Sequence, residues 1–145
     1  PGTENVAAIA GLGAAVAVAS RLDSDFKQLR DRLESELQAK APDLTIFAAG
    51  AERLSNTCCF AIDGMAADTT LIAADLEGIA VSSGSACSSG KVAASPVLAA
   101  MNIAPDLAQC AIRVSLGWNT TRDDVDRFID VWHRLIERHR TRSAA

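Results

Sequence analysis

The chain has 145 residues, of which 49% are hydrophobic and 22% are charged, and its formal net charge is −4. These values are typical of one globular domain with a sizeable core, and they exclude a disordered chain. An acidic chain without a Lys/Arg cluster among aromatic residues gives no reason to expect a nucleic-acid partner. The longest apolar segment, residues 6–19, is too short to span a bilayer and follows no positively charged leader, so we expect neither a membrane segment nor a secretion signal.

The first part of the chain predicts two helices and a hairpin. Small residues over 5–20 favour the first helix, and because the chain begins without Met we expect it to be an internal fragment. Asp23 or Ser24 can cap a second helix. The apolar face of that helix is formed at helical spacing by Phe26, Leu29, Leu33 and Leu37. Two segments rich in β-formers, 44–48 and 56–62, flank a glycine turn and predict a hairpin.

The rest of the chain alternates helices with short strands. We expect a helix over 66–75, a strand over 79–82, a helix that Ser95-Pro96 opens and Asn102 ends, a strand over 110–116, and a last helix from Thr121. The last helix has an apolar face formed by Val125, Phe128, Ile129, Trp132, Leu135 and Ile136. The order α-α-β-β-α-β-α-β-α predicts an α+β fold in which helices pack on a small, mostly antiparallel sheet.

The segment VSSGSACSSGK, residues 81–91, places one thiol, Cys87, among small residues. The spacing of its glycines and the missing hydroxyl after Lys91 distinguish it from a phosphate-binding loop, so we expect no nucleotide site. A core position rarely lies in such a run, whereas a loop of small residues permits close approach to a partner. Cys87 is therefore a candidate nucleophile. No base stands near it in the sequence, so the residues alone leave a catalytic and a structural role equally open.

The other three cysteines fit a structural role. Cys58 and Cys59 are adjacent in a predicted strand and point to opposite faces, and Cys110 lies in an apolar run. No CxxC pair occurs, and His133 and His139 stand six residues apart on one helix, so we expect no metal site. The cysteines form no dense disulfide framework, which favours a reducing, cytoplasmic setting.

Arg113 is a cation within the apolar strand AIRVSL. One interpretation is an arginine on an edge strand, or one whose apolar stem is packed while its charged head stays in solvent. The other interpretation is a bidentate clamp for a carboxylate, which a planar guanidinium suits better than an ammonium group does. The residues alone leave both interpretations open.

Four segments, in the right order, resemble the C-terminal part of cysteine desulfurases. They are RLSNT (53–57), VSSGSACSSG (81–90), SPVLAAM (95–101) and IRVSLGWNTTRDDVDRF (112–128). Cysteine desulfurases are pyridoxal-phosphate enzymes of fold type I in the class-V aminotransferase group. The opening PGTENVAAIAGLGAA resembles the segment that follows the lysine region of the cofactor domain. The resemblance implies that residues 1–20 are a helical segment joining a large cofactor domain that is absent here, and that residues 21–145 are the C-terminal small domain.

The resemblance also implies roles for individual residues. Cys87 matches the catalytic thiol, which takes the sulfur of L-cysteine as a persulfide and leaves alanine. Arg113 and Asn56 match positions at the substrate, and Thr3 resembles the residue that reaches the phosphate of the cofactor in a neighbouring subunit. A homodimer and a sulfur acceptor, such as an iron–sulfur scaffold protein, are implied as partners.

The Schiff-base lysine of the family lies in the absent large domain, and Lys27, Lys40 and Lys91 stand in no matching context. We therefore expect that this chain alone neither holds pyridoxal phosphate stably nor turns over cysteine. Two alternatives remain at this point. One is a non-catalytic interaction module that retains the fold, and the other is a selenocysteine lyase or a cysteine sulfinate-type activity, for which Cys87 would be dispensable.

Overall fold

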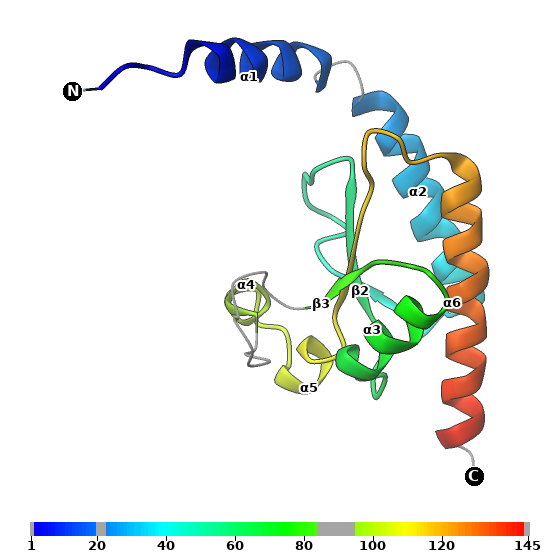
Figure 1. The fold of residues 1–145 in the computed structure, drawn as a ribbon. Coiled ribbons are helices and arrows are strands. Elements are labelled where there is room, and N and C mark those ends of the chain that lie inside the picture. The colour runs from blue at the N-terminus through cyan, green and yellow to red at the C-terminus, as the bar shows by residue number, and fades with distance from the viewer. Residues whose placement is uncertain (1, 20–22, 84–94, 144–145) are drawn as a thin grey trace.

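A computed structural model describes residues 2–19, 23–83 and 95–143, so Cys87 and Lys91 lie outside the described residues. Helices α1 (Val6–Ala19) and α2 (Asp23–Lys40) confirm the two helices expected at the start of the chain. Figure 1 shows α1 projecting away from the other elements, and none of its residues is buried. Since α1 is apolar on all sides, it has no polar face to present to water, a pattern typical of helices that are covered by other protein.

Four short strands form one antiparallel sheet in the order β1-β2-β4-β3. They are β1 (Thr45–Ile46), β2 (Thr57–Ala61), β3 (Ser82–Ser83) and β4 (Ile112–Ser115). The antiparallel pairing of β1 with β2 confirms the predicted hairpin, and the antiparallel pairing of all three neighbours confirms the predicted sheet type. The two inner strands are therefore β2 and β4, which come from distant parts of the sequence.

The strand predicted over 79–82 is wrong in its bounds, since the ladder contains Ser82 and Ser83 instead. The reason lies in the end of α3 (Ala67–Leu76). Gly78, at φ +74°, donates to the carbonyl of Asp75, and Ile79 donates to that of Ala74. This left-handed cap uses the backbone of residues 78 and 79, so the ladder starts later.

Two further caps follow the sequence expectations. Ser95 Oγ accepts a hydrogen bond from the Leu98 amide at the start of α4 (Pro96–Ala100), and Asn102 is left-handed at φ 58°. Thr121 and Asp124 bond reciprocally, each side chain accepting from the other's backbone amide, at the start of α6 (Arg122–Ser143). A short helix that the sequence analysis did not predict, α5 (Pro105–Ala108), lies between α4 and β4.

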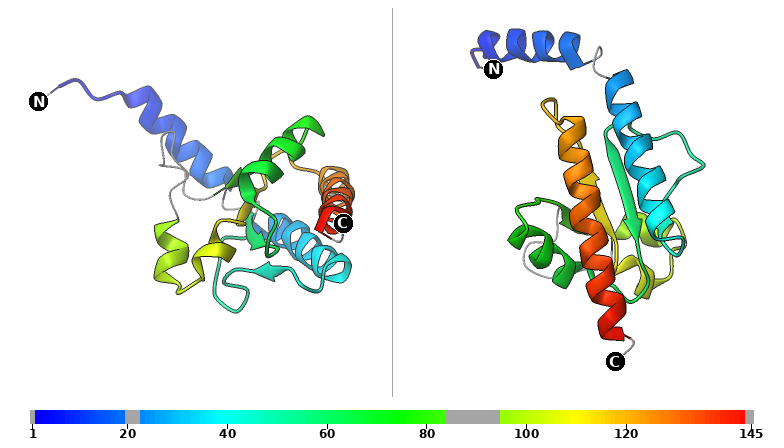
Figure 2. Two further views of the ribbon diagram at one scale, coloured as in Figure 1. Left: turned by 90° about the horizontal axis from the view of Figure 1, so that it is seen from below. Right: turned by 90° about the vertical axis from the view of Figure 1, so that its right-hand side faces the viewer.

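The sheet separates two groups of buried side chains. Along β2, Cys58 and Phe60 face the main core, while Cys59 and Ala61 face a smaller group formed with α4 and α5. The main core lies under α2, α3 and α6, and Figure 2 shows α2 and α6 side by side. Its centre is Trp132, whose ring meets that of Phe60 edge-to-face at 4.9 Å between centroids. All six residues of the predicted apolar face of α6 are buried.

No helix in the described ranges is both long enough and apolar enough to cross a membrane.

Candidate functional site

The candidate site is a pocket of about 450 Å³ beside Arg113, which we call the Arg113 pocket. Its walls come from β2 and β4, from the segment before β2, from Leu98 of α4, and from Met101, which follows α4. The two serines that flank the undescribed segment 84–94 lie close to this pocket. Ser95 lines it, and Ser83 ends β3, which pairs with β4. The pocket therefore lies where both ends of the Cys87 segment meet the fold.

Arg113 occupies an inner strand, so the edge-strand interpretation is wrong. Its Cα lies opposite Cys59 on β2 and opposite Ser82 on β3. The side chain lines the pocket, and its Nε is buried without a hydrogen-bond partner in the described part of the chain. A buried donor left unsatisfied costs about 1–3 kcal/mol. The position therefore favours a ligand with an anionic acceptor, for which a guanidinium is well suited.

A second arginine in the wall, Arg53, is held by Glu34 of α2. Its two terminal nitrogens donate to the two carboxylate oxygens at 2.7 and 2.9 Å. Because of these hydrogen bonds, the pKa of Arg53 lies above its ordinary value, and the guanidinium stays charged. Both side chains are largely buried, so the pair fixes the segment before β2 against α2. The charge of Arg53 is thus matched within the fold.

The other two predicted site residues do not line this pocket. Asn56 lies next to the pocket residue Thr57, but its side-chain nitrogen donates to the carbonyl of Leu116 at 3.3 Å and so closes the end of the β2–β4 pair. Thr3 is exposed and precedes α1, the helix that projects from the other elements in Figure 1. Within this chain, neither residue meets Arg113 in the pocket.

The three described cysteines are protonated near neutral pH. Burial raises the pKa of Cys58 far above its ordinary value. Burial also raises the pKa of Cys59, and the positive charge of Arg113 opposes that rise in part. The pKa of Cys110 is raised mainly by burial, and its Sγ donates to the carbonyl of Asp106 at 3.4 Å. Because the thiolate is the reactive form, these three thiols are poor nucleophiles.

Two pocket residues were not singled out as site residues from the sequence. Cys59 was given a structural role, yet it lies in the wall directly opposite Arg113. The alternation of β2 predicted that Cys58 and Cys59 face opposite sides, but the sequence did not reveal that β4 is the second strand that pairs with β2. Arg53 carried no signal of its own, since its partner Glu34 lies 19 residues earlier on α2.

Residues 1–128 match the family described as aminotransferase class-V, whose members depend on pyridoxal phosphate. The chain is 38% identical to the cysteine desulfurase IscS of Dictyoglomus turgidum over 144 residues, which are 97% of this chain and 36% of that protein. It is also 38% identical to a cysteine desulfurase of Cereibacter sphaeroides over 143 residues, which are 98% of this chain and 37% of that protein.

Solved structures give the same picture. A NifS-like protein from Rickettsia africae superposes with a TM-score of 0.78 at 35% identity, over 94% of this chain and 36% of that chain. A cysteine desulfurase CsdA from Escherichia coli superposes with a TM-score of 0.68 at 25% identity, over 94% and 32%. The chain thus spans little more than a third of the length of the proteins that it matches.

Proposed function

Because the chain belongs to the class-V aminotransferase family, we propose that it is the small C-terminal domain of a cysteine desulfurase. The observation that carries this proposal is Arg113. An arginine on an inner strand, with a buried Nε lacking a partner among the described residues, lines a pocket next to both ends of the Cys87 segment. In the proposed reaction Arg113 binds the substrate carboxylate, and residues 21–145 form the domain that carries it.

Cys87 is the proposed nucleophile. Its sulfur attacks the sulfur of L-cysteine, so that an S–S bond forms, the substrate C–S bond breaks, and alanine and a Cys87 persulfide result. The high pKa values of Cys58, Cys59 and Cys110 support this choice, because those thiols are protonated at neutral pH. β3 ends at Ser83, four residues before Cys87, and the covalent chain can span at most about 14 Å over that distance.

We propose that this chain does not hold pyridoxal phosphate stably by itself. Among the described residues, no lysine lines the Arg113 pocket, and Lys27 pairs with Asp31 on the surface of α2. We propose that the cofactor is held mainly by the part of the longer protein that lies outside this chain. Residues 1–20 would join the two parts, and the apolar surface of α1 is consistent with a helix that other protein covers.

The remaining parts of the proposal concern partners. We infer a homodimer in which Thr3 reaches the cofactor phosphate of the neighbouring subunit, and Asn56 acts near the substrate. The persulfide sulfur would pass to an acceptor, such as a scaffold protein for iron–sulfur assembly, in the cytoplasm. The identity of the known relatives as cysteine desulfurases supports L-cysteine as the substrate.

Peptide-resolved mass spectrometry tests the function. The chain, recombined with its cofactor domain, is exposed briefly to L-cysteine and trapped with an alkylating agent. We expect one added sulfur on the peptide that contains Cys87, none on the peptides of Cys58, Cys59 and Cys110, and none anywhere in the Cys87→Ser variant. Cys59→Ser is the matched control and should still carry the sulfur. Alanine release that persists in Cys87→Ser would favour a selenocysteine lyase or sulfinate-type activity instead.

A second variant tests the role of Arg113. Arg113→Lys keeps the charge but loses the planar fork, so we expect the KM for cysteine to rise at least about tenfold, equivalent to about 1.4 kcal/mol. No turnover of cysteine and no persulfide on Cys87, despite bound cofactor, would favour a non-catalytic module.

A further inference from the structure

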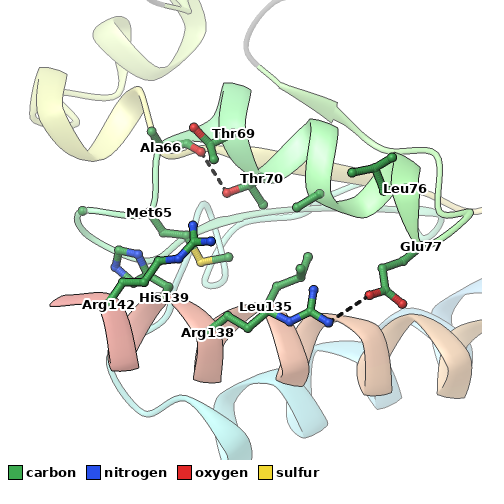
Figure 3. A pocket seen from close by; sticks show the side chains of 12 residues that line it. Met65, Ala66, Thr69, Thr70, Leu76, Glu77, Leu135, Arg138, His139 and Arg142 are labelled. Carbon is green, nitrogen blue, oxygen red and sulfur yellow. Dashed lines mark hydrogen bonds and ion pairs between the residues drawn. The ribbon is translucent and has the colours of Figure 1, made fainter. Parts of the chain in front are cut away.

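A second pocket, of about 390 Å³, lies between α3 and α6 and shares no lining residue with the Arg113 pocket. We call it the α3–α6 pocket. Figure 3 shows it from close by, with side chains of α6 facing those of α3 and of the turn before α3. Its volume falls within the range of small-molecule sites, roughly 300–1,000 Å³. The function proposed above assigns no role to it.

Apolar side chains form the floor of the α3–α6 pocket. Met65 and Leu135 belong to the main core and are buried, and Ala73 packs against that core from α3. Leu76 continues the apolar wall at the far end of α3, where it is 83% exposed. An apolar ligand body placed here would cover side chains that water otherwise contacts, which stabilises a complex by about 25 cal/mol per Å² of apolar surface buried.

Two arginines and a histidine stand along the α6 wall. Arg138, His139 and Arg142 all line the pocket from one face of the last turns of α6. Glu77, on the opposite wall, is paired with Arg134 at 2.8 Å and with Arg138 at 3.4 Å. These contacts compensate the charge of Glu77 and draw Arg138 toward the Leu76 end of the pocket.

The Met65 end of the pocket differs from the Leu76 end in the pairing of its charged groups. Arg142 has no carboxylate within ion-pair distance in the described ranges, and in Figure 3 it extends toward this end. His139 lies against the turn at Gly64, where its Nε2 would stand 3.7 Å from an added Cβ. Gly64 has φ +76°, a conformation that favours glycine, so the turn and the close imidazole depend on the same residue. Arg142 therefore places a positive charge at the Met65 end of an apolar cleft, beside the imidazole of His139.

We propose that the α3–α6 pocket binds a small organic phosphate monoester, with its phosphate at Arg142 and His139 and its apolar body over Met65, Ala73 and Leu135. A phosphate is favoured over a neutral group because guanidinium groups donate charge-assisted hydrogen bonds to its oxygens. A free inorganic anion would leave the apolar floor uncovered, so both halves of the ligand contribute to binding.

Three probes test this proposal by NMR titration of the 145-residue chain. They are 2-naphthyl phosphate, which has both halves, inorganic phosphate, and 2-naphthol. We expect 2-naphthyl phosphate to bind at least about tenfold more tightly than either of the other two. We also expect its largest shift changes at the backbone amides of residues 64–66 and 138–142 rather than at those of 111–115 beside Arg113.

Two variants locate the phosphate. Arg142→Ala should weaken 2-naphthyl phosphate about fivefold, the upper end for an exposed ion pair. Arg140→Ala is the matched control, because it removes the same charge from the same turn of α6 but does not line the pocket, and it should change affinity less than about twofold. Equal effects of the two variants, binding of 2-naphthol as tight as that of its phosphate, or shift changes centred on Arg113 would each overturn the proposal.

Discussion

The pair Glu34–Arg53 offers a direct test of how the wall of the Arg113 pocket is held. Replacing Glu34 by Gln keeps the shape of the side chain but removes its charge. Arg53 would then keep its own charge, because a guanidinium does not deprotonate in proteins, and would lose its partner. Arg30, which is buried, would also lose a nearby carboxylate, because its Nε lies 3.9 Å from a carboxylate oxygen of Glu34.

The expected loss follows from burial. Breaking a fully buried ion pair costs about 3–5 kcal/mol, and breaking an exposed pair costs at most about 1 kcal/mol. The side chains of Arg53 and Glu34 are 15% and 13% exposed, and they form two hydrogen bonds. We therefore expect Glu34→Gln to lower the free energy of unfolding by about 2–3 kcal/mol.

Urea unfolding measures this change. Trp132 is 2% exposed and reports loss of the core, so the measurement is made in a Trp118→Phe background, which removes the signal of a tryptophan that is 82% exposed. Asp43→Asn is the control, since it breaks an ion pair with Arg140 in which the side chains are 55% and 42% exposed, and it should cost at most about 1 kcal/mol.

A double-mutant cycle with Arg53→Gln separates the pair from its surroundings. The double variant should be destabilised by less than the sum of the two single variants, because the second change leaves no charge unpaired. A Glu34→Gln variant as stable as Asp43→Asn would refute the argument that this pair is buried and holds the pocket wall.

Two further predictions concern the edges of the fold. Thr121→Ala removes the hydroxyl that accepts from the Asp124 amide at 3.2 Å and should lower the free energy of unfolding by about 1 kcal/mol, whereas Thr121→Ser should restore most of it in the same urea assay. The hydrogen bond from Arg134 lowers the pKa of Glu77 below its ordinary 4.5, so the stability from this group is present above that value and is lost as the pH falls through the lower folded value. A Glu77→Gln variant should therefore show a flatter decline of the urea midpoint between pH 5 and pH 3, and an unchanged slope would contradict the assignment.

Local signals in the sequence located most of the elements. The small residues at the start, the apolar spacing in α2 and α6, the caps at Ser95 and Asn102, and the start of a helix at Thr121 all predicted structure that is observed. These signals work because helix periodicity and capping depend on residues within four positions of one another. The errors lie where one turn decides the outcome. Because of the cap at Gly78, β3 starts later in the chain than predicted. The short helix α5, which starts at Pro105, was not predicted.

The sequence by itself determined the α+β class, the helices other than α5 and the hairpin, and it singled out Arg113 and the Cys87 segment as candidates. It could not determine the order of the strands, because pairing between β2 and β4 joins residues more than fifty positions apart. That order alone places Arg113 on an inner strand opposite Cys59, and the contact of Arg53 with Glu34 completes the pocket wall. Likewise, the α3–α6 pocket exists because the second half of α6 packs along α3. Local patterns fix elements, whereas the pockets depend on contacts between residues that the sequence keeps far apart.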